Sequence, residues 1–152
     1  MKSFAIASAM LTLALSLSGC IGSPIALTPE TEQRLQTQAP IRFLLTFDDG
    51  PSASGYNNPS RSVIADLAQN PVLPQIKAVF FLQTEAARSG GSSRGRKTME
   101  REYAAGHILA FHTATGFHTN HRWLNDAELE STLTRGAADI AAITGSLPVL
   151  VR

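Results

Sequence analysis

The hexapeptide TFDDGP, residues 46–51, places two adjacent carboxylates, Asp48 and Asp49, directly after the largely apolar run of residues 41–45. A short apolar run bounded by proline and glycine predicts a buried strand, so the carboxylates stand where a core strand ends. Neighbouring side chains of a regular strand point to opposite faces, so Asp48 and Asp49 share one site only if the backbone leaves extended geometry. We expect the glycine and proline that follow to supply that turn, because glycine tolerates unusual φ angles and proline fixes φ. A solvated turn without a function is the alternative.

The composition is that of one globular domain. Of the 152 residues, 43% are apolar and 16% are charged, which is enough apolar material for a packed core. The formal net charge of +1 gives no basic footprint for nucleic acid, so we expect no nucleic-acid partner.

The first twenty residues have the pattern of an export signal. Lys2 precedes an apolar segment, residues 4–17, that is short for a membrane span, and Leu-Ser-Gly-Cys follows at residues 17–20. That tetrapeptide resembles a bacterial lipobox, in which the signal is cut before the cysteine and the thiol then carries lipid. An ordinary signal peptide with an incidental cysteine is the alternative.

Cys20 is the single cysteine, so an exported chain has no disulfide to make and acylation would consume its one thiol. We therefore expect a lipoprotein signal peptide at residues 1–19, a lipidated Cys20, and a tether at residues 20–40 with little apolar periodicity. Acyl chains each add about 0.8 kcal/mol per buried methylene, so several of them would anchor the mature chain to a bacterial membrane in the cell envelope.

Short apolar runs alternate with helical patterns in the rest of the chain. Residues 77–83 predict a second buried strand, residues 108–111 a third, and residues 148–151 the start of a fourth. A helix capped by Ser60 is expected between the first two strands, and the order strand, helix, strand indicates parallel βαβ units. The expected fold class is therefore α/β.

Two further helices complete this pattern. One should end just before Gly106, and the other should begin with a capping box of Asn125 and Glu128 and end at Gly145. The basic segment of residues 88–97 is expected to be a flexible solvated loop. The alternative is that its cations line a groove for an anionic polymer.

Three histidines follow the third strand directly: His112, His118 and His121. In α/β folds the functional groups gather at the carboxyl ends of parallel strands, so these imidazoles could meet Asp48 and Asp49 although they are distant in sequence. Neutral nitrogen donors and an anionic oxygen are the ligands of a divalent-metal site. Surface histidines without a ligand role are the alternative.

TFDDGP resembles the first signature of the polysaccharide deacetylases, the NodB-homology group that forms carbohydrate esterase family four. The similarity continues, in order, through four later segments: Ala78–Phe81, Gly106–Thr113, Leu124–Leu129 and Leu147–Arg152. It implies a distorted (β/α) barrel of parallel strands. Because the barrel needs more strands than the four expected here, we expect residues 41–152 to be the amino-terminal portion of such a domain, truncated at its carboxyl-terminal side.

The resemblance also assigns roles to residues. Asp49 would be a metal ligand and Asp48 the general base. His112 matches the family's first histidine ligand, and Arg152 matches the arginine that orients the base.

The second histidine ligand departs from the family's spacing. It usually lies four residues after the first, where this chain has Gly116. His118 keeps the usual distance to the segment that begins at Leu124, whereas His121 would need a compensating shortening after it, and we favour His118. His107, which follows a helix-ending glycine, is interpreted as structural.

The function that the resemblance implies is metal-dependent hydrolysis, with Zn²⁺ as the expected cation. The substrate would be an acetylated polysaccharide of the cell envelope, either peptidoglycan or an exopolysaccharide, from which N-acetyl groups are removed. The family's catalytic acid is a histidine of a later signature, for which we find no matching segment. An O-acetyl esterase acting on acetylated polysaccharide and a catalytically inactive glycan-binding lipoprotein are the alternatives.

Overall fold

The structure is a computed structural model that describes residues 28–37, 42–73 and 75–152. The chain divides into two compact units, Met1–Ile41 and Arg42–Arg152. The first unit contains helix α1 (Pro29–Thr37), where acidic residues in the first turn and a basic residue in the last complement the helix dipole. The predicted signal peptide and Cys20 lie outside the described residues. Within the described part of the chain, no helix is long and apolar enough to cross a membrane.

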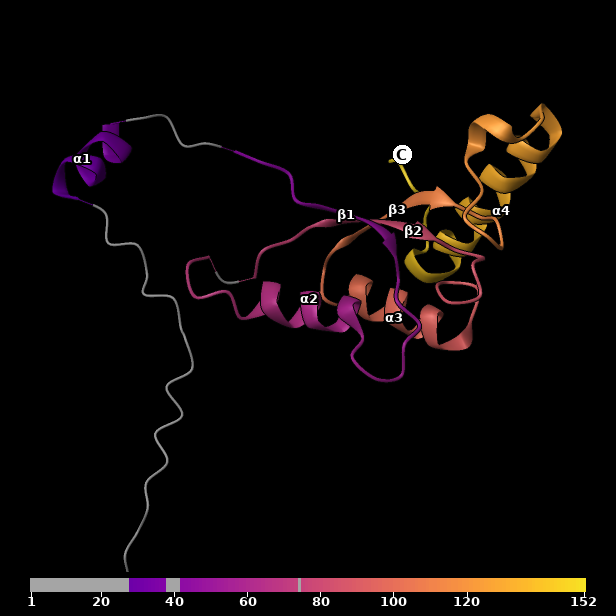
Figure 1. The fold of residues 1–152 in the computed structure, drawn as a ribbon, viewed down its shortest axis with the longest axis horizontal. Helices are drawn as coiled ribbons and strands as arrows, with labels where there is room; N and C mark the ends of the chain where they lie inside the picture. Colours follow the sequence, from indigo (N-terminus) through magenta and orange to yellow (C-terminus); the bar gives the residue numbers. More distant parts are fainter. Residues whose placement is uncertain (1–27, 38–41, 74) are drawn as a thin grey trace, which may run out of the picture. The chain divides into compact units, whose positions relative to one another are not determined.

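The second unit contains a parallel sheet of three strands, with β2 between β1 and β3. The strands are β1 (Thr46–Gly50), β2 (Val79–Gln83) and β3 (Ile108–Thr113), and the helices are α2 (Pro59–Ala68), α3 (Ser93–Ala104), α4 (Asp126–Thr144) and the short 3₁₀ helix η1 (His121–Trp123). Val151 forms a single parallel bridge with Phe111, within the predicted fourth strand. The predicted α/β class with parallel strands is confirmed (Figure 1).

One face of the sheet carries the helices. Side chains alternate along each strand, so every second residue of β2 and β3 faces α2, α3 and α4. This core contains Phe80 and Leu82 of β2, Leu109 and Phe111 of β3, Leu67 of α2, Met99 of α3 and Ile140 of α4. The opposite face holds a smaller buried cluster of Val79, Phe81 and Ala110, against which Leu150 packs. Helices on the outer face of a parallel sheet and side chains on its inner face form an incomplete (β/α) barrel.

Helix α4 approaches β3 closely because residue 136 is a glycine. A Cβ atom at Gly136 would collide with the ring of Phe111, which is only 1% exposed. Burying a side chain of this size contributes roughly 1.5–3 kcal/mol. The contact fixes the carboxyl-terminal half of β3, which carries His112.

Helix α4 begins and ends where the sequence predicts. The Asn125 side chain accepts a hydrogen bond from the Glu128 backbone N–H at 3.0 Å, and the Glu128 carboxylate accepts one from the Asn125 N–H at 2.9 Å. Gly145 ends the helix with a φ of 77°, and Gly106 follows α3 with a φ of 81°. The capping box and both glycine ends are confirmed.

Helix α2 begins two residues earlier than predicted. Asn58 is its cap in place of Ser60, because Pro59 fits the first helical position, where no backbone N–H is needed. The Ser60 hydroxyl instead accepts a hydrogen bond from the backbone N–H of Ser52 at 2.9 Å. Ser60 therefore holds the backbone just after the Asp48-Asp49 turn.

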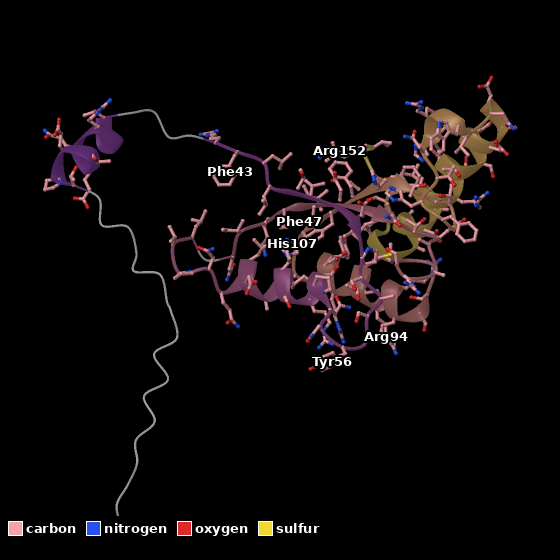
Figure 2. All side chains as sticks on the ribbon, in the orientation of Figure 1. Phe43, Phe47, Tyr56, Arg94, His107 and Arg152 are labelled. Atoms are coloured by element: carbon pink, nitrogen blue, oxygen red, sulfur yellow. The ribbon has the colours of Figure 1, made fainter. Side chains whose placement is uncertain are left out.

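Two other expectations are wrong. Residues 42–45 precede β1 and do not form a buried strand: Phe43 and Leu44 are 79% and 68% exposed (Figure 2). Of the apolar residues in this segment, Leu45 alone packs against the core. The basic segment of residues 88–97 is not a loop throughout, because Ser92 caps α3 and the helix begins at Ser93.

Candidate metal centre

The two carboxylates lie in a β-bulge near the end of β1. Phe47 pairs with Phe80 and Gly50 with Leu82, so three steps along β1 match two along β2. The predicted departure from extended geometry is confirmed, but the positive φ, 64°, is at Asp49 and not at the following glycine. Aspartate is among the few residues that adopt this left-handed conformation. The bulge lets two adjacent aspartates reach different partners at one sheet edge.

A second bulge lies at the end of β3. Leu82 pairs with Phe111 and Gln83 with Thr113, which leaves His112 as the extra residue. Bulges re-aim side chains and are frequent beside active sites. Both chemically important strand ends are therefore bulged, and both lie at the carboxyl edge of the sheet.

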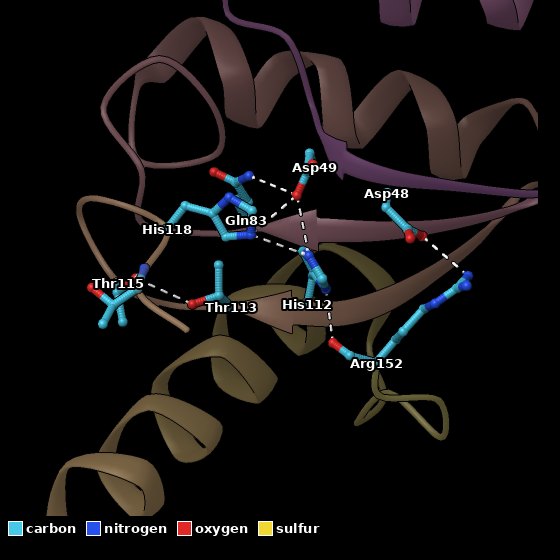
Figure 3. Close-up of polar contacts among 9 residues, drawn as sticks. Asp48, Asp49, Gln83, His112, Thr113, Thr115, His118 and Arg152 are labelled. Carbon is cyan, nitrogen blue, oxygen red and sulfur yellow. Dashed lines mark hydrogen bonds and ion pairs between the residues drawn. The ribbon is translucent and has the colours of Figure 1, made fainter. Parts of the chain in front are cut away.

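Asp49, His112 and His118 converge at this edge (Figure 3). The Nε2 atoms of His112 and His118 each lie 3.1 Å from Oδ1 of Asp49. The two Nε2 atoms are 3.3 Å apart. The side chain of Asp49 is 58% exposed, that of His118 44% and that of His112 20%, so the cluster is open to solvent on one side.

The hydrogen bond on the far side of the His112 ring defines its tautomer. Nδ1 of His112 lies 2.7 Å from the backbone carbonyl oxygen of Arg152. A carbonyl only accepts, so Nδ1 carries the proton and Nε2 of the neutral ring presents its lone pair to Asp49. Lone pairs on Nε2 and on a carboxylate oxygen repel unless a cation lies between them. Such an arrangement, with the second ring nitrogen held by a carbonyl, is typical of metal-ligating histidines.

The three donor atoms fit a small divalent cation. Ligands about 2.0–2.1 Å from a tetrahedral ion such as Zn²⁺ lie about 3.3–3.4 Å from one another, close to the separations of these atoms. One carboxylate and two imidazoles form a set that could hold the ion. The exposed side of the cluster leaves room for further ligands.

His118, and not His121, belongs to this cluster. His118 adopts a φ of 53° at the end of a turn that is fixed by a hydrogen bond from the Thr119 backbone N–H to Oγ1 of Thr115 at 2.7 Å. Gly116 lies within the same turn, which accommodates the longer spacing between the two histidines.

His121 follows this turn, at the start of η1. Its ring stacks on Phe111, with centroids 5.9 Å apart, and its Nε2 is buried without a hydrogen-bond partner among the described residues. Burial lowers the pKa of His121 below its ordinary value, and the nearby His112 and His118 lower it further. The structure therefore favours His118 over His121 as the second histidine of the candidate site.

Asp48 faces Arg152 at the same edge of the sheet (Figure 3). Nη1 of Arg152 lies 3.4 Å from Oδ1 of Asp48 and 3.2 Å from Oγ1 of Thr46. The guanidinium carbon lies 5.7 Å from the ring centroid of Phe81. Arg152 thus touches both halves of the site, because its side chain pairs with Asp48 and its carbonyl orients His112.

Gln83 is a site residue that the sequence analysis missed. Its Nε2 donates a hydrogen bond to Oδ1 of Asp49 at 3.1 Å. It is the last residue of β2, the strand between the two bulged ones. The sequence feature that could have identified Gln83 as a site residue is its position at the carboxyl end of a predicted strand.

His107 is placed as predicted, away from the cluster. It is buried, and its Nδ1 accepts a hydrogen bond from the Ala78 backbone N–H at 3.3 Å. Burial lowers the pKa of His107, and the nearby Lys77 lowers it further, so the ring is a neutral acceptor in the core.

Two hollows adjoin the cluster. One, of about 340 Å³, is lined by Asp48, Asp49 and Arg88 together with eight further residues. The other, of about 470 Å³, is lined by His112 and His118 together with Trp123, Arg152 and four further residues. Together they offer a concave surface of mixed polar and apolar lining beside the metal-binding side chains.

Comparison with known proteins gives one family and several solved structures. The sequence profile described as polysaccharide deacetylase matches residues 36–152. A peptidoglycan N-acetylglucosamine deacetylase is 26% identical, with a TM-score of 0.57, and the match covers 72% of this chain and 44% of that one. The Xyl-CE4 domain of a multidomain xylanase from the hindgut metagenome of Trinervitermes trinervoides is 25% identical, with a TM-score of 0.56 and coverages of 72% and 46%.

A third structure shows the same fold at lower identity. The chitin deacetylase of the fungal pathogen Colletotrichum lindemuthianum is 24% identical, with a TM-score of 0.54, and the match covers 67% of this chain and 40% of that one. The chain spans less than half the length of each of these three structures. A search of curated protein sequences finds no match.

Proposed function

The chain belongs to the polysaccharide deacetylase family, and from this membership we propose that it removes N-acetyl groups from an amino-sugar polysaccharide. The observation that carries the proposal is the convergence of Asp49, His112 and His118, with donor atoms 3.1–3.3 Å apart, beside Asp48 and Arg152. Two of the similar structures are deacetylases of chitin and of peptidoglycan N-acetylglucosamine. We propose peptidoglycan or an exopolysaccharide as the substrate.

We propose Zn²⁺ as the ion held by the three ligands. When bound, such an ion polarises a carbonyl and makes water more acidic, which is the chemistry that hydrolysis of an acetamide needs. Gln83 and the Arg152 carbonyl hold Asp49 and His112 in place for it. In other proteins, mutation of a residue that holds a metal ligand in this way weakens metal affinity by about 10- to 100-fold.

Asp48 is the proposed general base. The Arg152 guanidinium, at 3.4 Å, orients its carboxylate, and the carboxylate can accept the proton of the attacking water. The open side of the cluster admits the acetyl group, and the adjoining hollows can hold the sugars that flank it. Correct placement of base and acetyl group contributes to rate by removing the entropy of bringing them together.

The test separates the two carboxylates. Acetate release from chitin oligosaccharides and from peptidoglycan is measured with added Zn²⁺ for the full chain, Asp48→Asn and Asp49→Asn. Asp48→Asn should lose about 10²- to 10⁴-fold in activity while keeping its Zn²⁺ affinity, whereas Asp49→Asn should lose both. Activity that survives chelation, or that survives in Asp49→Asn, would contradict the proposed mechanism.

An O-acetyl esterase is the second candidate. The observation in its favour is the 25% identity to the Xyl-CE4 domain of a xylanase. Acetate release from acetylated xylan without release from chitin oligomers would support it. Glycan binding without acetate release from either substrate, across several metals, would instead support the inactive glycan-binding protein.

We also propose that the mature chain is a lipoprotein of the bacterial cell envelope, anchored through Cys20. The support is the sequence Leu-Ser-Gly-Cys after a basic and apolar amino terminus. Expressed in a bacterium, the chain should partition into detergent with the membrane fraction, and Cys20→Ser should release it. Equal partitioning of both forms would contradict the lipid anchor.

A further inference from the structure

A third hollow, of about 570 Å³, lies between the loop after β1 and the start of α3. Its lining residues are Ser52, Ala53, Ser54, Ala87, Arg88, Ser92, Ser93 and Arg94. It shares Ser52 and Arg88 with the hollow that contains Asp48 and Asp49. The two hollows therefore adjoin, and one surface leads from the candidate metal centre to Arg94.

The walls of this hollow are fixed by backbone contacts. The Ala53 N–H donates to the Arg88 carbonyl at 3.0 Å, and Nη1 of Arg94 donates to the Ala53 carbonyl at 3.3 Å. Gly95 lies so close to the backbone of Ser89 that a Cβ atom there would collide with it. The backbone that carries both arginines is therefore held in place before a ligand binds, which lowers the entropy lost on binding.

The charge of this hollow has one sign. None of its eight lining residues is acidic, and both charged ones are exposed arginines. Neither Arg88 nor Arg94 takes part in an ion pair within the described part of the chain. The carboxylates of the adjoining hollow already have partners, since Asp48 pairs with Arg152 and Asp49 accepts a hydrogen bond from Gln83. The guanidinium groups are therefore available to an anion from outside.

The hollow is separate from the place where the acetyl group would react. Figure 2 shows Arg94 on the side of the sheet that carries α2 and α3, whereas Arg152 lies on the opposite side. An anionic group held by Arg94 would therefore belong to a neighbouring unit of the polymer and not to the sugar that loses its acetyl group.

We propose that Arg88 and Arg94 form a subsite for an anionic substituent, a carboxylate or a phosphate, on the glycan that the chain binds. A guanidinium presents paired N–H donors that match the two oxygens of either group. The identity of the polymer as an N-acetylated glycan rests on the proposed function. The subsite makes acidic glycans better ligands than neutral ones of the same length.

The experiment compares oligosaccharides that differ in charge. Binding of a hyaluronan hexasaccharide, which carries N-acetylglucosamine and carboxylates, is measured by calorimetry against chitohexaose, which carries N-acetylglucosamine alone. N,N′-Diacetylchitobiose 6′-phosphate against N,N′-diacetylchitobiose forms the phosphate arm. Arg88→Gln/Arg94→Gln is the test variant, and Arg101→Gln is the matched control, because Arg101 is exposed near the other end of α3.

The acidic ligand should bind about tenfold more tightly than its neutral counterpart for each arginine that contacts it. The double variant should lose this preference, and Arg101→Gln should keep it. If the acidic ligand is preferred in only one of the two comparisons, and this preference depends on the arginines, then the anion of that comparison, carboxylate or phosphate, is the ligand. Equal affinities of acidic and neutral ligands in both arms, or a preference that persists in the double variant, would overturn the subsite.

Acetate release distinguishes the subsite from the proposed function. It is measured separately on chitohexaose. Arginine-dependent binding without acetate release would refute the deacetylase and leave the subsite intact. Acetate release without a preference for the acidic ligand would refute the subsite and leave the deacetylase intact.

Discussion

Replacing Glu102 with glutamine should remove a large pH dependence from the stability of the domain. Glu102 lies on α3 with its side chain fully buried, and neither carboxyl oxygen has a hydrogen-bond partner among the described residues. Burial raises the pKa of Glu102 from 4.5 to about 8. The native protein therefore keeps this acid protonated at neutral pH.

The magnitude follows from proton linkage. Above pH 4.5 the unfolded chain releases the Glu102 proton, while the native chain retains it up to about pH 8. The native state binds more protons in this window, so the free energy of unfolding falls as pH rises through it. The slope is about 1.4 kcal/mol per pH unit, and the loss over the whole window is about 5 kcal/mol. That loss is comparable with the total stability of a small domain.

The assay is urea unfolding, followed by circular dichroism between about pH 5 and pH 8 in the presence of a chelator. Glutamine has the shape of glutamate but does not ionise, so wild type should lose about 4 kcal/mol relative to Glu102→Gln across this range. Glu100→Gln is the control, because Glu100 is exposed on the same helix, and it should follow wild type. Parallel curves for wild type and Glu102→Gln would refute the desolvation of this carboxyl group.

Four further substitutions probe the site and its support. His118→Ala should weaken Zn²⁺ affinity by at least about 100-fold and His121→Ala by less than about threefold, measured by competition with a chromophoric chelator; the reverse order would make His121 the ligand. Gln83→Ala should weaken Zn²⁺ binding by about tenfold, because the amide holds Asp49 from 3.1 Å, and an unchanged affinity would remove Gln83 from the site. Gly136→Ala should lower the free energy of unfolding by about 1–3 kcal/mol, because the added methyl collides with a buried ring, and an unchanged urea midpoint would contradict that packing.

The sequence predicted which residues converge at the candidate site better than it predicted the backbone geometry that brings them together. The need for Asp48 and Asp49 to leave extended geometry followed from the period of a strand alone. The bulge that provides it depends on register against β2, which no local pattern reveals, and the unusual φ fell on Asp49 itself. The choice between His118 and His121 likewise depended on a turn held by Thr115.

Residues that act through neighbours were harder to find. Gln83 is an ordinary residue at a strand end, and its amide matters only because Asp49 lies opposite it across the sheet. The Arg152 carbonyl that orients His112 carries no side-chain signal at all. The predicted burial of Phe43 and Leu44 was wrong, because an apolar segment is buried only where another layer of the protein covers it.

The most direct test of the metal centre is calorimetric titration of Zn²⁺ into the metal-free full chain. Wild type should bind one equivalent with submicromolar affinity, and Asp49→Asn should weaken this binding by at least about 100-fold. Asp66→Asn, at an exposed carboxylate on α2, should bind as wild type does. Full affinity in Asp49→Asn, or no binding in wild type, would contradict a metal site built from Asp49, His112 and His118.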